Sequence, residues 1–71
     1  MGERKLQAKL GQKIKAIRVQ KNMTQNALAM ECDFEKASLS RIESGQSNPT
    51  VRTLYKLSVA LETPLGDFFK E

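Results

Sequence analysis

The chain has 71 residues, of which 39% are hydrophobic, enough for one small domain with a modest core. It contains no histidine and a single cysteine, Cys32, which excludes a histidine-based catalytic site, an intramolecular disulfide and a zinc cluster. The formal net charge of +4 favours an anionic partner, and without clustered carboxylates or a phosphate-binding loop we expect no enzyme, cofactor, metal or small-molecule substrate.

The hydrophobic pattern predicts five short helices in succession and no strand, which makes residues 1–71 a single all-α domain. Apolar residues mark the first helix by stepping four, four and three positions: Leu6, Leu10, Ile14 and Ile17. We expect residues 1–5 to form a flexible extension before this helix. Asn22 is expected to stop the helix in a left-handed conformation.

The first helix also carries most of the positive charge. Residues 1–21 hold seven basic residues and one acidic residue, whereas residues 22–71 hold five basic and seven acidic residues. Lys5, Lys9 and Lys13 repeat every four residues and therefore share one helix face. A solvated surface is the ordinary explanation of such a row.

The second helix is predicted at about residues 25–32. Thr24 is placed to cap its first turn with a side-chain oxygen. Leu28, Ala29 and Cys32 fall on its inward face, and the two small residues among them allow another helix to cross closely.

The third helix is predicted at residues 36–44, between Asp33, which tolerates a left-handed turn, and Gly45, which stops the helix. Leu39 and Ile42 point inward. An outer arc of roughly 140° holds two cations, three small residues and no anion: Lys36, Ala37, Ser40, Arg41 and Ser44. A helix kept only for solubility normally mixes both charges, so this face suits an anionic partner, with a short solvated helix as the alternative.

Two further helices complete the pattern. Thr50 is placed to cap the fourth, whose inward residues are expected to be Val51, Leu54, Leu57 and Leu61. Thr63 as a cap and Pro64 in the first turn would open a short apolar fifth helix with Leu65, Phe68 and Phe69.

Two short helices joined by a tight turn, with a basic face exposed on the second, form a helix-turn-helix at about residues 24–45. The segments "MTQNALA", "LSRIESG", "NPT" and "LYKLSVAL" stand at a mutual spacing that resembles the Cro and lambda-repressor (XRE) type of domain, over about residues 10–69. The resemblance implies a compact five-helix lambda-repressor-like fold and a transcriptional regulator that binds double-stranded DNA. The short chain is also similar to the controller proteins of restriction–modification systems.

The resemblance further implies that the third helix enters the major groove. Arg41 is the main expected base contact, because its planar fork can bind guanine O6 and N7 together; an ion pair with Glu31 or Glu35 is the alternative. The other expected base contacts are Lys36, Ala37 and Ser40. Residues expected to contact the phosphate backbone, and so to set position rather than sequence, are Thr24, Gln25, Ser38, Ser44, Gln46 and Asn48.

The family pattern also pairs Arg18 with Glu43 as a buried ion pair between the first and third helices. The chain departs from the pattern in its turn, where Asp33 replaces the usual glycine and Glu35 the usual Ser or Thr cap.

One small module makes too few contacts for tight specific binding, so we expect a homodimer. Its two recognition helices would lie about 34 Å apart on a two-fold symmetric operator. The candidate interface consists of Leu61, Pro64, Leu65, Phe68 and Phe69, for which packing into the chain's own core is the alternative.

Two other functions fit the same fold. One is an antitoxin that neutralises a protein partner, and the other is a protein-interaction module that has lost DNA binding; Arg41 and Gln25 argue against the second. No apolar run approaches the roughly 20 residues that span a bilayer, and a lone thiol suits a reducing compartment. We therefore expect a cytoplasmic protein of a prokaryote or phage, with no membrane partner.

Overall fold

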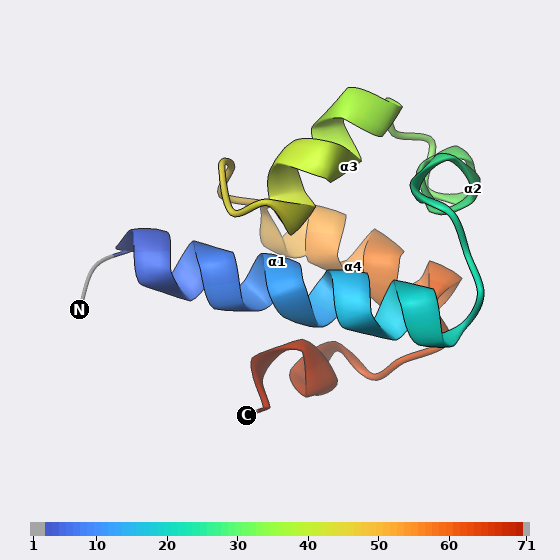
Figure 1. Cartoon of the computed structure of the whole chain (residues 1–71). Coiled ribbons are helices and arrows are strands. Elements are labelled where there is room, and N and C mark those ends of the chain that lie inside the picture. Colours follow the sequence, from blue (N-terminus) through green and yellow to red (C-terminus); the bar gives the residue numbers. More distant parts are fainter. Residues whose placement is uncertain (1–2, 71) are drawn as a thin grey trace.

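The computed structural model describes residues 3–70, with side chains described from Lys5 onward. Within this range the chain is all-helical and contains no strand, in agreement with the predicted fold class. The elements are α1 (Glu3–Gln20), α2 (Gln25–Glu31), α3 (Lys36–Glu43), α4 (Val51–Ala60) and a 3₁₀ helix, η1 (Leu65–Phe69). Figure 1 shows α1 running through the middle of the molecule, with α3 on one side of it and η1 on the other.

The expectations differ from the structure at both ends of the chain. Residues 3–5 belong to α1, where we had expected an extension; arginine and lysine are good helix formers, so the helix extends beyond its apolar stripe. The rest of that extension, residues 1–2, lies outside the described residues.

The fifth helix is a single 3₁₀ segment rather than an α-helix. Thr63 does not cap it, because its hydroxyl donates a hydrogen bond to the Leu61 carbonyl oxygen at 3.0 Å, and Pro64 takes the capping position without a side-chain bond. Five residues are too few for a stable α-helical ladder, and the tighter 3₁₀ form is common in such short pieces.

One hydrophobic core holds the elements together. Its buried residues come from every element: Leu10, Ile14, Leu28, Ala29, Cys32, Leu39, Ile42, Leu54, Leu57, Leu61 and Phe68. Two residues expected to face inward do not join it: Leu6 is 57% exposed and Val51 is 73% exposed. Both lie in the first turns of their helices.

Within the described part of the chain, three non-glycine residues have left-handed backbone conformations where the chain reverses direction: Asn22 (φ 59°), Asp33 (φ 60°) and Glu62 (φ 52°). Gly45, after α3, has φ 79°. The first two and Gly45 follow the turn preferences of their residue types. Glu62 does not follow such a preference. Two backbone hydrogen bonds at the end of α4 hold its conformation: the Glu62 amide donates to the Val59 carbonyl at 3.1 Å, and the Thr63 amide donates to the Ser58 carbonyl at 2.9 Å.

Gly11 lets α1 and α3 approach each other closely. A Cβ atom at this position would lie 2.7 Å from the carbonyl oxygen of Glu43 and would also clash with that of Ile42. Carbonyl oxygens at the end of a helix cannot rotate away as a side chain can. The position is therefore closed to larger residues, and it fixes how α3 is seated on α1.

Candidate nucleic-acid interface

The helix-turn-helix occupies the sequence between Thr24 and Gly45, as predicted. The Thr24 hydroxyl accepts a hydrogen bond from the Ala27 amide at 3.0 Å and caps α2. The turn is closed by the Phe34 amide, which donates to the Ala29 carbonyl at 2.8 Å. Glu35 caps α3 by backbone position only, with no side-chain hydrogen bond. The turn thus sets the angle between the two helices with backbone bonds.

The outer face of α3 is open to solvent. Lys36, Ala37, Ser40 and Arg41 are all exposed, whereas the opposite face is buried. Among residues 5–70 the structure has two ion pairs, Arg18 with Glu43 and Lys70 with Asp67. Arg41 therefore has no carboxylate partner in that set, and its guanidinium is available to a ligand.

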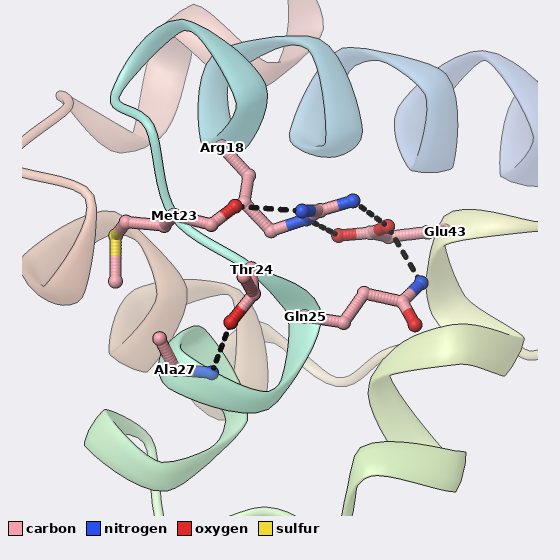
Figure 2. Close-up of polar contacts among 6 residues, drawn as sticks. All are labelled: Arg18, Met23, Thr24, Gln25, Ala27 and Glu43. Atoms are coloured by element: carbon pink, nitrogen blue, oxygen red, sulfur yellow. Dashed lines mark hydrogen bonds and ion pairs between the residues drawn. The ribbon is translucent and has the colours of Figure 1, made fainter.

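A buried polar cluster fixes α3 from behind (Figure 2). Arg18 Nε lies 2.7 Å from Glu43 Oε2, and Arg18 Nη2 lies 3.0 Å from Oε1, which makes a two-point ion pair. Arg18 Nη1 also donates to the Met23 carbonyl at 2.7 Å, and Gln25 Nε2 donates to Glu43 Oε1 at 2.9 Å. Both charged side chains are nearly inaccessible, at 9% and 2% exposure. The cluster ties α1, the start of α2 and the end of α3 together.

The residues expected at the DNA backbone differ in accessibility. Four are exposed: Thr24, Ser44, Gln46 and Asn48. Ser38 and Gln25 are half-buried, and the side-chain nitrogen of Gln25 is already bonded to Glu43. The Ser44 hydroxyl donates a hydrogen bond to the Arg41 carbonyl at 3.2 Å, which holds the Ser44 side chain against the end of α3. Sequence spacing could not reveal the partner of Gln25, which is 18 residues away.

The expected dimer residues divide into two groups. Leu61 and Phe68 are 0% and 2% exposed and belong to the chain's own core, which removes them from a surface interface. Pro64 is exposed, Leu65 is half-buried and packed against the core, and Phe69 is 54% exposed.

Two apolar residues beside Phe69 were missed by sequence reasoning. A small groove on this edge is lined by residues that include Leu6, Pro49 and Phe69. In the sequence, Leu6 continues the apolar stripe of the first helix, which predicts a core position, and Pro49 indicates only a loop. Only the fold brings the three together.

The described residues contain no group of three or more His, Cys, Asp or Glu side chains placed to hold a metal ion. Cys32 is buried, and its Sγ lies 3.6 Å from the Lys56 carbonyl oxygen. Burial, with a smaller contribution from Glu31, raises the pKa of the Cys32 thiol above its ordinary value. The thiol therefore stays protonated, as suits a structural residue. No helix in the described range combines the length and hydropathy needed to cross a membrane.

Comparisons with known proteins agree with this geometry. The helix-turn-helix family model matches residues 14–68. The control protein C.BamHI of Bacillus amyloliquefaciens is 44% identical over 52 residues, which cover 72% of this chain and 64% of that protein. The transcriptional regulator SutR of Escherichia coli is 36% identical over 55 residues, which cover 78% of this chain and 31% of that protein.

The chain thus spans less than two thirds of the length of both relatives. A solved structure, the restriction–modification controller protein C.AhdI of Aeromonas hydrophila, superposes with a TM-score of 0.86 at 27% identity. That match covers 87% of this chain and 94% of C.AhdI. The chain therefore belongs to the helix-turn-helix family that the XRE-type motifs of its sequence indicate.

Proposed function

We propose that this protein is a transcriptional regulator that binds double-stranded DNA sequence-specifically as a homodimer, with α3 in the major groove. The observation that carries the proposal is the exposed face of α3, which has two cations, no anion and no ion pair within residues 5–70. A rigid helix with such a face matches the width and the negative potential of the major groove.

Arg41 is the main reading residue in this proposal. Its guanidinium can donate two parallel hydrogen bonds to O6 and N7 of a guanine. Lys36 would bind a guanine edge, Ala37 would contact a thymine methyl group and Ser40 would donate to a base edge. The support for these roles is that all four side chains are exposed on one face while the helix beneath them is held by the Arg18–Glu43 pair.

Phosphate contacts are assigned to the exposed polar residues that flank α3. Thr24 lies before α2, and Ser44, Gln46 and Asn48 follow α3. Ser38 and Gln25 are secondary candidates because they are half-buried. Such contacts would hold the helix in register without reading sequence.

The dimer surface that we propose is centred on Phe69, with Leu6 and Pro49 beside it and Pro64 and Leu65 at its margin. Support comes from the exposure of Leu6 and Phe69, which are 57% and 54% accessible. A symmetric contact there would be self-complementary and would close as a dimer.

We further propose that the regulated locus is a restriction–modification system in a prokaryotic cytoplasm. C.BamHI and C.AhdI, two proteins to which the chain is similar, are named as control or controller proteins, and C.AhdI matches over nearly its whole length.

The experiment that tests the proposed function is selection of bound duplexes from a random library by the purified protein at near-physiological salt. The expected product is a two-fold symmetric site whose half-sites lie about one helical turn, roughly 34 Å, apart. Binding that enriches no sequence and fades steadily with rising salt would identify a general cation–phosphate interaction instead, and would overturn the proposal.

A further inference from the structure

A second surface lies between α1 and η1, on the other side of α1 from α3 (Figure 1). Here a groove of about 550 Å³ has a largely apolar floor formed by Leu6, Leu10, Ala16, Phe68 and Phe69. Its cationic members are Lys9, Lys13 and Lys70. The volume lies within the range of surfaces that take a small ligand or a few anchoring side chains.

Helix geometry separates this surface from the proposed DNA-binding face. Gly11 marks the side of α1 that touches α3. Lys9 and Lys13 are each two residues from Gly11, which turns them roughly 200° around the helix axis. They therefore point away from α3, and a duplex bound to α3 would lie across the body of the protein from them.

The charges of this surface are largely uncompensated. Lys9 and Lys13 have no ion pair with a carboxylate of residues 5–70, whereas Lys70 is paired with Asp67 at 2.9 Å. Lys5, Lys9 and Lys13 also repel one another at four-residue spacing, which weakens α1 slightly. An anionic partner would remove that repulsion, and the proposed DNA contacts do not.

We infer that this groove, the α1–η1 groove, binds an acidic segment of another protein that carries apolar anchor residues. The cations fit carboxylates at the margin, and the apolar floor with the half-exposed Phe69 fits one or two large apolar side chains. A duplex offers phosphates but no apolar anchors of this kind. The inference goes beyond the proposed function and relies on it only for placing DNA at α3.

A second copy of the chain, whose proposed contact shares Leu6 and Phe69 with this groove, is a poorer match for the groove's cations. Three of its four exposed acids within residues 5–70, Glu31, Asp33 and Glu35, lie at the α2–α3 turn; the fourth, Glu62, follows α4. Joining that turn to the groove of a neighbour makes a head-to-tail contact, which extends into a chain of molecules rather than closing as a dimer.

The test uses a synthetic helical peptide of about 15 residues with Leu and Phe on one face and Glu on the other. Its titration into the full-length protein is followed by amide NMR shifts and by fluorescence anisotropy. Shifts should map to the α1–η1 groove and leave α3 unchanged. A peptide with the same composition but scattered apolar residues should bind at least about tenfold more weakly, because it cannot present its anchors together.

The decisive variant is Lys9→Glu with Lys13→Glu, and its matched control is Lys15→Glu with Lys56→Glu, two exposed lysines that do not line this groove. The groove variant should weaken peptide binding at least about tenfold and the control less than about twofold. Equal losses in both variants would mean general charge attraction and would overturn the inference. Lack of peptide binding to the wild-type protein would also overturn it.

Two further readouts separate the other occupants. If the groove variant abolishes self-association in sedimentation, the groove belongs to a dimer; if a random-sequence duplex displaces the peptide, it is a second DNA site. Either result overturns the inference. Duplex selection by the wild-type protein is a separate experiment. If it enriches no site, the peptide result still tests the groove; if the peptide does not bind, the duplex selection still tests the proposed DNA binding.

Discussion

Glu43 shows how one buried residue supports an exposed site. Its carboxylate accepts hydrogen bonds from Arg18 on α1 and Gln25 on α2, while its backbone belongs to α3. No buried side-chain N or O atom of the described residues lacks a hydrogen-bond partner, so the polar cluster is fully satisfied. A buried cluster whose polar groups are all hydrogen-bonded destabilises the folded state little, whereas removing one partner destabilises it strongly.

We therefore predict that Glu43→Ala lowers the free energy of unfolding by about 3 kcal/mol or more, because it leaves the Arg18 guanidinium buried without a counter-charge. Replacing both partners, Arg18→Met with Glu43→Leu, should recover much of the loss. Urea denaturation followed by circular dichroism measures both. The control is Asp67→Ala, which removes the exposed pair with Lys70 and should cost at most about 0.5 kcal/mol. A Glu43→Ala loss as small as the control's would contradict this account of the cluster.

At the residue scale the sequence alone indicated the outward face of α3 well, since that face follows from helix periodicity around Leu39 and Ile42. It could not indicate that Gln25 binds Glu43, because that contact depends on how two helices cross. Of the expected dimer residues, Leu61 and Phe68 lie in the core. This could not be predicted, because the C-terminal segment is apolar on several sides and too short for its periodicity to separate core from surface.

At the scale of elements, the seating of α3 on α1 depends on Gly11. From the sequence alone, this glycine indicates only a slightly weaker helix. It does not indicate that another helix packs closely against it, because that depends on which element lies beside it in the fold. The limits of α2, α3 and α4 were predictable, because caps such as Thr24 and Thr50 act locally. The left-handed Glu62 was not, since its residue type carries no turn preference.

The substitution Gly11→Ala tests how closely α3 packs against α1. Helix propensity alone would stabilise α1 by about 1 kcal/mol. Overpacking against the backbone oxygens of Ile42 and Glu43 typically costs about 1–3 kcal/mol, so we predict a net loss of up to about 2 kcal/mol.

Thermal and urea denaturation would measure this loss. Gly66→Ala is the control, because a Cβ at that position meets nothing within 4 Å, and it should leave the stability nearly unchanged. A more stable Gly11→Ala protein would show that α1 and α3 are not closely seated in solution.

At the scale of the whole molecule, three surfaces lie around one small core. The outer face of α3 is open on one side of α1, and the α1–η1 groove lies on the other. Leu6 and Phe69 line both that groove and the smaller groove with Pro49. The proposed dimer would leave α3 free for DNA, but it would compete with a partner segment in the α1–η1 groove for Leu6 and Phe69.

The proposed dimer predicts that Phe69→Ser raises the dimer dissociation constant by about tenfold or more, because it removes the largest exposed apolar side chain of that edge. Analytical ultracentrifugation over a range of concentrations measures the change. Val59→Ser is the matched control: Val59 is 58% exposed, but on α4, and its replacement should not alter the dimer. Equal effects of the two substitutions would place the dimer surface elsewhere.

The central claim is that α3 reads bases through Arg41, and the most direct test repeats the duplex selection with Arg41→Ala. The account predicts that one symmetric pair of positions loses its preference, worth about 1–3 kcal/mol of discrimination per half-site, while the rest of the site is retained. Arg52→Ala, an equal change of charge at an exposed position on α4, should leave the preferred sequence intact. An unchanged site from Arg41→Ala would contradict the claim.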